Sequence, residues 1–232
     1  MLKTKRLLSY IISITFILVA LLGVVHFCSF DKSFYESEHS KLMLYGKHIN
    51  EHIGITNEDL TELTSFTLDY LNDPDASLDK KLVIKGELRE VFNDDEKAHM
   101  VDVRTLNLNS IYLGIASALI FVICLIVYIC IKGDSYYLFS IYKKTLFYAL
   151  IVFAFIGLWI LIDFDSFWTT FHHIFFVGND LWLLNLHTDV LIMIVPPEFF
   201  DHLVTKIVII FLITIILFGV ILYLFSRKKI KE

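Results

Sequence analysis

Residues 168–200 of this chain combine histidines, carboxylates and aromatic rings in one short stretch. Histidine has an ordinary pKa of about 6.5, so its side chain both accepts and donates protons near neutral pH. The stretch therefore has the residue types for proton-transfer chemistry. On composition alone, an aromatic belt at a membrane interface, with no chemistry, is an equally good interpretation. The polar residues of the stretch are His172, His173, His187, Asp180, Asp189 and Glu198, and its rings include Trp168, Phe171, Phe175, Phe176, Trp182, Phe199 and Phe200.

A second histidine–carboxylate pair precedes the apolar run that begins at Leu108. The acidic start at Asp94 and the apolar periodicity that follows predict a helix that continues into that run. His99 and Asp102 are three residues apart and would lie on one face of this helix. They would stand one to two turns before the apolar run.

Two turns and an acidic residue near the C-terminal part of the stretch are further candidates. Gly178, Asn179 and Asp180 predict a tight turn whose backbone N–H groups could bind an oxyanion. Thr188 and Asp189 are typical of another turn or a helix cap. Glu198 follows two prolines and is either an acid in the first turn of a helix or a polar group of the site.

A competing constellation lies earlier in the chain. His48 and His52 have the i, i+4 spacing that places two imidazoles on one helical face, and His39 could join them around a transition metal. This pattern supports an alternative function: a membrane sensor or partner subunit, without enzymatic activity, whose acidic outer domain binds a protein or a metal.

The elements that would hold these residues are membrane helices. The chain is 56% hydrophobic with a mean hydropathy of +0.67, which excludes an ordinary soluble domain. A helix needs about 20 apolar residues to cross a bilayer, and four runs are long enough. The fold class is therefore an all-α membrane protein with four transmembrane helices and a small, mainly helical extracytoplasmic domain between helices 1 and 2.

The charges predict the orientation. Basic residues gather before the first apolar run, between the second and third, and after the fourth, and the positive-inside rule places these segments and both termini in the cytoplasm. The predicted organisation is 1–30 (cytoplasmic N-terminus and helix 1), 31–107 (extracytoplasmic domain), 108–131 (helix 2), 132–144 (cytoplasmic loop), 145–164 (helix 3), 165–203 (extracytoplasmic or interfacial catalytic segment) and 204–232 (helix 4 and basic tail).

Within 31–107, two local structures are predicted. Thr56 and the acids after it are typical of a capped helix start, and the turn residues after Asn72 would end that helix. Residues 81–84 predict a short extended piece that closes at Gly86.

Two separated patterns together resemble the lipoprotein intramolecular transacylase (Lit) family of bacteria. The first is His99-Met100-Val101-Asp102-Val103. The second pattern comprises Phe171, His172, Phe175, Phe176, Gly178, Asn179, Trp182, Thr188, Asp189, Leu191, Ile192, Pro197, Glu198, Phe199 and Phe200. Three residues depart from the pattern of the family: Asn185-Leu186 stands where an Asp-Pro pair is expected, and Val177 where a proline is common.

The resemblance implies an enzyme of the bacterial cell membrane that acts at the outer leaflet. Its substrate would be a diacylglyceryl-modified lipoprotein in membrane lipid, and the sn-2 acyl chain would move to the N-terminal α-amine. It implies no cofactor and no metal, and we expect a monomer that binds no nucleic acid. We expect His99 to be the base, oriented by Asp102, and His172 to be the proton donor, with these roles exchangeable. The expected substrate-binding residues are Phe171, Phe175, Phe176, Gly178, Asn179, Trp182, Asp189 and Glu198.

Overall fold

A computed structural model describes residues 2–41, 53–84 and 86–228. The chain divides into two compact units. The first consists of Met1–His26, Ser110–Phe167 and Thr205–Glu232, and the second of Phe27–Asn109 and Trp168–Val204. The second unit therefore joins the predicted outer segment 31–107 and residues 168–203 of the predicted segment 165–203 into one body.

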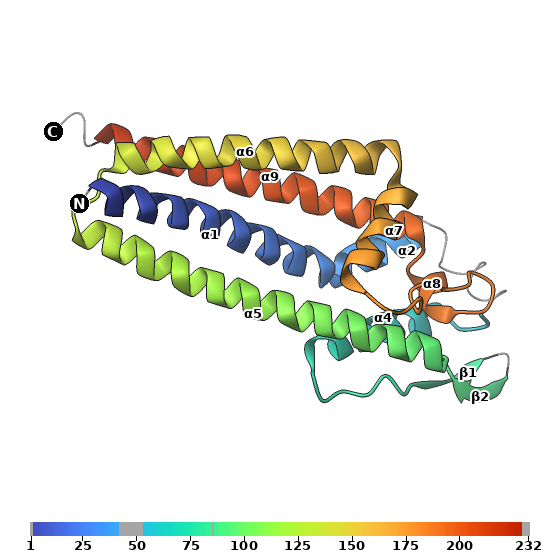
Figure 1. Cartoon of the computed structure of the whole chain (residues 1–232). Coiled ribbons are helices and arrows are strands. Elements are labelled where there is room, and N and C mark those ends of the chain that lie inside the picture. Colours follow the sequence, from blue (N-terminus) through green and yellow to red (C-terminus); the bar gives the residue numbers. More distant parts are fainter. Residues whose placement is uncertain (1, 42–52, 85, 229–232) are drawn as a thin grey trace. The chain divides into compact units, whose positions relative to one another are not determined.

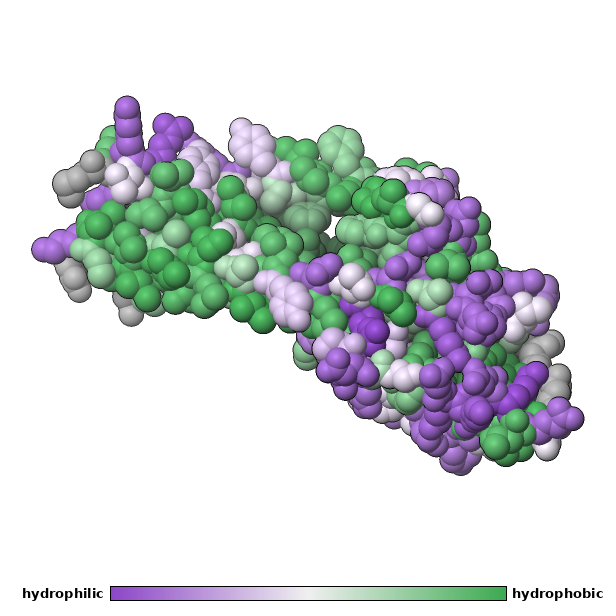
Figure 2. All heavy atoms as spheres, turned by 60° about the horizontal axis from the view of Figure 1, so that its bottom comes forward, coloured by the Kyte–Doolittle hydropathy of each residue, from purple (hydrophilic) through white to green (hydrophobic). Residues whose placement is uncertain are grey.

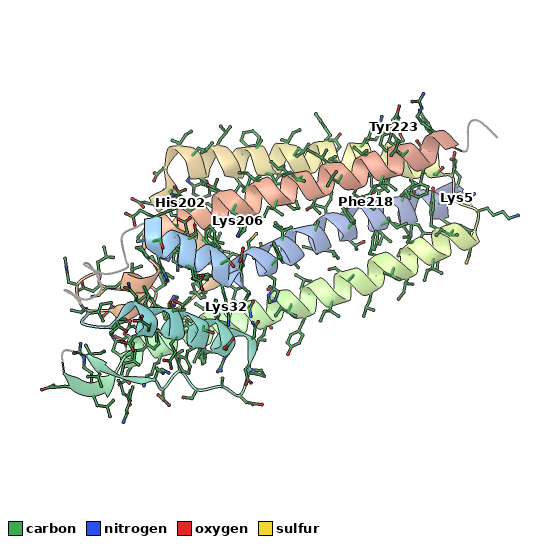
Figure 3. The ribbon with its side chains drawn as sticks, turned by 180° about the vertical axis from the view of Figure 1, so that it is seen from behind. Lys5, Lys32, His202, Lys206, Phe218 and Tyr223 are labelled. Atoms are coloured by element: carbon green, nitrogen blue, oxygen red, sulfur yellow. The ribbon has the colours of Figure 1, made fainter. Side chains whose placement is uncertain are left out.

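The first unit is built from the greater part of four long helices, of which α1, α5 and α9 also extend into the second unit: α1 (Leu2–Ser29), α5 (Asp94–Cys130), α6 (Ser135–Ile162) and α9 (Pro197–Lys228). All four are long and apolar enough to cross a membrane, as the sequence predicts. Figure 1 shows them running beside one another. Many apolar side chains on their outer faces are exposed, including Leu161 and Phe155, and Figure 2 shows this hydrophobic surface. Inside the bundle, Phe218 of α9 (Figure 3) stacks on Phe16 with ring centroids 3.6 Å apart.

The helices are longer than their apolar runs. The predicted loop 132–144 is mostly helix, because α6 begins at Ser135. The side chain of Asp134 caps that helix by accepting a hydrogen bond from the Tyr136 amide. Likewise α9 begins at Pro197, since proline has no N–H to lose and suits the first helical position. Apolar runs located the spans but not the polar turns that extend them.

The second unit contains α2 (Lys32–Lys41), α4 (Asn57–Asn72), α8 (Val190–Ile194) and most of α7 (Phe164–Phe175). The predicted start and end of α4 are confirmed. Thr56 and Asp59 form a complete capping box, and the helix ends at Asn72.

A small hairpin adds the only strands among the described residues. The extended piece at β1 (Lys81–Ile84) is confirmed, and Gly86 adopts a positive φ of 87° in the turn. The partner strand β2 (Glu87–Glu90), antiparallel to β1, was not predicted. All four residues of β2 are exposed, so its sequence lacks the alternation that marks a half-buried strand.

The core of the second unit draws on both of its chain segments. Leu60 and Leu63 of α4, Phe92, and Met100 of α5 belong to one buried cluster. Val190, Leu191 and Ile194 of α8 belong to the same cluster. The short apolar run 190–195 is therefore core of this unit, and it fixes the loop before it relative to the first turns of α5.

Candidate active site

His99 and His172, 73 positions apart in the chain, lie side by side in the second unit. The ring centroids are 6.2 Å apart, and the planes are inclined by 30°. His99 comes from the second turn of α5 and is 7% exposed, while His172 comes from α7 and is 5% exposed. Phe176 lies against both, with its centroid 5.2 Å from His99 and 5.4 Å from His172. Two proton-transfer groups are thus held together away from water.

His172 is fixed in one tautomer. Its Nδ1 lies 2.8 Å from the carbonyl oxygen of Trp168, one helical turn earlier. A carbonyl only accepts, so Nδ1 carries the proton and Nε2 keeps its lone pair. Burial lowers the pKa of His172, the Trp168 carbonyl raises it and neighbouring His173 lowers it, with a net lowering. His172 is therefore a neutral base at neutral pH.

Among the described residues, no hydrogen bond joins Asp102 to His99. The Asp102 Oδ2 accepts a hydrogen bond of 3.0 Å from the Asn179 amide, whereas the buried Nδ1 of His99 has no partner. The helical spacing puts Asp102 and His99 on one face, but the carboxylate bonds across to the loop after α7. Asp102 thus positions the turn at Gly178. Burial and then His172 lower the pKa of His99 to about 4, and the Asp102 carboxylate partly offsets this lowering, so its role as the group that orients His99 stays a prediction.

The turn predicted at Gly178 is present. Gly178 has a φ of 95°, which favours glycine, and the Asn179 Oδ1 accepts a hydrogen bond from the Leu181 amide. The side-chain oxygen of Asn179 therefore stabilises the turn, and its side-chain nitrogen donates a hydrogen bond to Asp102 on α5.

Aromatic rings enclose His172. Trp182 stacks on it with centroids 4.8 Å apart and planes inclined by 29°, and Trp168 meets it edge-on at 4.7 Å. Phe171 lies 5.5 Å from His172, and Phe175 is one ring further out, 4.7 Å from Phe171. The predicted wall residues Phe171, Phe176 and Trp182 therefore contact the histidine, and Phe175 does so only through Phe171.

Within the described residues, neither Asp189 nor Glu198 forms a hydrogen bond with His99 or His172. Asp189 accepts hydrogen bonds from the Asn185 amide, the Thr188 hydroxyl and the Asn93 side chain, so it shapes the turn before α8. Glu198 is exposed in the first turn of α9, which is the first of the two interpretations that its sequence allows. Asp189 thus belongs to a local turn, and the substrate-binding role of both acids stays a prediction.

Sequence reasoning missed Glu96. Its side chain is 1% exposed, with Oε1 accepting from the Leu191 amide at 2.6 Å and Oε2 from the Asn93 amide at 2.8 Å. The Asn93–Glu96 spacing is that of a capping box and was a usable signal. The contact of Glu96 with α8 could not be predicted from the sequence, because it depends on a residue 95 positions later.

A second buried polar cluster lies between α2 and the beginning of α9. Glu38 accepts hydrogen bonds from Lys41 and from His202, which is labelled in Figure 3. The ring of His39 is buried, with Nε2 2.9 Å from the Ile194 carbonyl oxygen. The other members of the proposed metal site, His48 and His52, lie outside the described residues. Within the described ranges, no three His, Cys, Asp or Glu side chains form a group suited to a metal ion.

Comparisons with known proteins agree with this architecture. The family model of the lipoprotein intramolecular transacylase Lit matches residues 10–200. The structure of the membrane integral lipoprotein intramolecular transacylase Lit from Bacillus cereus is similar, with a TM-score of 0.78 and 21% identity over 100% of this chain and 99% of that one. A variant of the Bacillus cereus protein with a histidine-to-arginine mutation has a TM-score of 0.75 and 20% identity, over 98% of this chain and 95% of that one.

A search of curated protein sequences found no match. The solved structures show that the fold is shared, and the family model covers most of the chain. With four helices able to span a bilayer, this is a membrane protein, and it belongs to the Lit family of lipoprotein intramolecular transacylases.

Proposed function

We propose that this protein moves the sn-2 acyl chain of a diacylglyceryl-cysteine lipoprotein to the α-amine of the same cysteine, which gives a lyso-form N-acylated lipoprotein. The observation that carries the proposal is the buried pair His99–His172, with ring centroids 6.2 Å apart. Membership in the transacylase family supports the reaction class. The finer assignments below rest on the geometry of this pair.

The first step is attack of the amine on the ester carbonyl. The α-amine of a peptide has an ordinary pKa of about 7.7–8.0, and its nitrogen must lose a proton while the C–N bond forms. The lone pair on Nε2 suits His172 to take that proton, because Nδ1 is occupied by the Trp168 carbonyl. This exchanges the two histidine roles expected from the sequence.

The second step is collapse of the tetrahedral intermediate. The bond between the former carbonyl carbon and the glyceryl sn-2 oxygen breaks, and this oxygen, which stays on the glyceryl group, takes up the proton that the amine gave. His99, beside His172 and buried, passes this proton from His172 to the oxygen. One proton moves from nitrogen to oxygen overall, so the reaction consumes no second substrate.

Much of the rate acceleration would come from holding amine and ester together. Well-oriented intramolecular reactions gain up to about 7–11 kcal/mol over their bimolecular counterparts. The aromatic rings around His172 suit an acyl chain, and the exposed Phe175 suits contact with lipid. The protein's part is thus to bind the lipid, exclude water and carry one proton.

We place the reaction at the outer leaflet of the cell membrane. Basic residues such as Lys5, Lys132 and Arg227 belong to the first unit, and by the positive-inside rule they face the cytoplasm with both termini. The segment 31–107, which belongs to the second unit, is acidic by contrast. Lipoproteins anchored in the outer leaflet and surrounding lipid would be its partners, with the protein acting as a monomer.

The experiment is mass spectrometry of a lipoprotein N-terminal peptide from a bacterial strain without other N-acylating enzymes. Expression of this protein should convert the diacylglyceryl free amine to an N-acylated, monoacylglyceryl cysteine, and the strain with an empty vector should not. A peptide that keeps its free amine despite well-expressed protein would reject the reaction. The sensor or partner-subunit alternative would then take its place.

A further inference from the structure

Two buried polar side-chain atoms of the second unit lack a hydrogen-bond partner, within the part of the chain that the structure describes. They are Nδ1 of His99 and Nε1 of Trp182. Both belong to rings that flank His172, with centroids 6.2 Å and 4.8 Å from it. Buried polar groups in folded proteins are nearly always paired, and the exceptions call for an explanation such as a catalytic role.

The chemistry of the indole narrows that explanation. Its N–H donates and cannot accept, so only an acceptor can satisfy it. The near-parallel stacking, with planes inclined by 29°, keeps the indole of Trp182 directly beside the imidazole of His172. An acceptor that satisfies Trp182 would therefore lie next to the proposed base.

The loop holds this indole in place. The Leu181 amide donates to Asn179 Oδ1, and the Leu183 amide donates to the Asp180 carbonyl. Asn179 is itself bonded to Asp102 on α5. Trp182 thus sits on a turn fastened to the helix that carries His99, and a donor fixed before the reaction needs no reorganisation during it.

We propose that the Trp182 Nε1–H donates a hydrogen bond to the carbonyl oxygen of the migrating acyl group. This inference rests on the proposed transacylation. When the amine nitrogen bonds to the carbonyl carbon, the π electron pair moves to oxygen, and Nε1–H stabilises the resulting oxyanion. The pair returns as the bond between the acyl carbon and the glyceryl sn-2 oxygen breaks, and the amine proton goes by way of the histidines to that oxygen.

The test compares two replacements in the full-length protein, reconstituted with a synthetic diacylglyceryl lipopeptide. Trp182→Phe keeps an aromatic ring but removes the donor. Replacing Trp182 by 3-benzothienylalanine, whose sulfur stands where Nε1–H was, removes the donor with almost no change of shape. Trp159→Phe in α6 of the first unit is the matched control, since it removes an indole N–H elsewhere. Turnover and KM are measured by mass spectrometry of the product.

Loss of one oxyanion donor lowers kcat by about 10²–10³. We expect a loss at the lower end of that range for both Trp182 replacements, with KM changed less than about threefold, and an unchanged Trp159→Phe variant. Wild-type kcat in the benzothienyl variant would overturn the donor role, even if Trp182→Phe loses activity, because ring packing would then explain the loss. A wild-type protein that fails to transfer the chain would instead reject the transacylation, and this inference with it.

A second measurement does not depend on how the variants fold. In protein labelled with ¹⁵N at the indole nitrogens, a non-reactive amide analogue of the lipopeptide should shift the Trp182 Nε1–H proton signal downfield. The Trp159 signal should stay in place. A Trp182 signal that does not move on saturation with the analogue would contradict the proposed hydrogen bond.

Discussion

The two units bury different polar groups. In the first unit, the buried polar residues of the described chain are serines, and Ser9, Ser13 and Ser226 each donate to a carbonyl within their own helix. In the second unit, the described buried polar residues include the ionisable side chains of Glu38, His39, Glu96, His99 and His172. Figure 2 shows the corresponding change on the surface, hydrophobic over the first unit and largely hydrophilic over the second.

This difference indicates that the first unit anchors the protein in the membrane and that the second unit carries the chemistry. A buried serine bonded to its own helix completes a membrane span and carries no charge. A buried ionisable group costs stability unless it is paired, and it is retained where its proton is used or where it fixes a contact. Glu96 fixes a contact, and His172 keeps a proton-accepting nitrogen. The following predictions test whether this division holds.

The largest effect is expected at the histidine pair. His172→Ala removes the proposed base, and general acid–base catalysis by one side chain contributes about 10²–10⁴-fold. We expect the rate of acyl transfer to fall by about 10³ or more, and His99→Ala to be similarly severe. The measurement is product formation by purified protein in lipid. Retention of a tenth of the activity by His172→Ala would remove it from the mechanism.

The pH profile should show the lowered pKa of His172. Because burial lowers that pKa, the imidazole stays neutral, and competent as a base, below its ordinary value of about 6.5. Between about pH 6.5 and 8 only the substrate amine titrates, so log kcat/KM should rise with unit slope. At lower pH, where His172 also takes a proton, the slope should approach two. A change from slope one to slope two centred at pH 6.5 or above would mean that burial does not lower this pKa.

Glu96→Gln tests the structural use of a buried carboxylate. The two oxygens of Glu96 accept hydrogen bonds from the backbone N–H groups of Leu191 and Asn93. In glutamine one of these oxygens is replaced by an NH₂ group, which cannot accept, so one backbone N–H group would lose its partner. Leaving a buried group unsatisfied costs about 1–3 kcal/mol, so the free energy of unfolding should fall by that amount. The same change at exposed Glu87 of β2 is the control and should be nearly neutral. Equal denaturation midpoints would show that the network adds no stability.

The smallest effect is expected in the first unit. Ser13→Ala removes a hydroxyl bonded to the Ser9 carbonyl, which remains part of the helix. Polar contacts inside membrane bundles average about 0.6 kcal/mol, and we expect a loss of that size or less, with acyl transfer unchanged. Unfolding in detergent measures the free energy of unfolding, and the activity assay measures the rate of acyl transfer. A loss as large as that of Glu96→Gln would erase the contrast between the units.

Local patterns predicted much of this fold. Apolar length located the four spans, and the capping signals at Thr56 and Asp94 located helix starts, because these features depend on a few adjacent residues. The hairpin strand β2 and the early starts of α6 and α9 were missed, since exposed strands and polar helical turns carry weak periodicity.

The sequence indicated which residues make up the candidate site, but it did not indicate all of their hydrogen-bond partners. The His99 and His172 motifs were visible because their residue types and order resemble a family. The partner of Asp102 was not, since helical spacing places a carboxylate on a face without saying which of two neighbours it bonds. Asn179 lies 77 positions away, and only the packing of the loop against α5 brings its side-chain nitrogen to Asp102.

The most direct test of the central claim is a crossover experiment with purified protein in liposomes. One lipopeptide carries a deuterated sn-2 chain, and a second, distinguished by its peptide mass, carries an unlabelled chain. We predict N-acylated products in which each peptide keeps the chain that it arrived with, as transfer within one molecule requires. N-acylated peptides with exchanged chains, or no N-acylated product at all, would contradict the account.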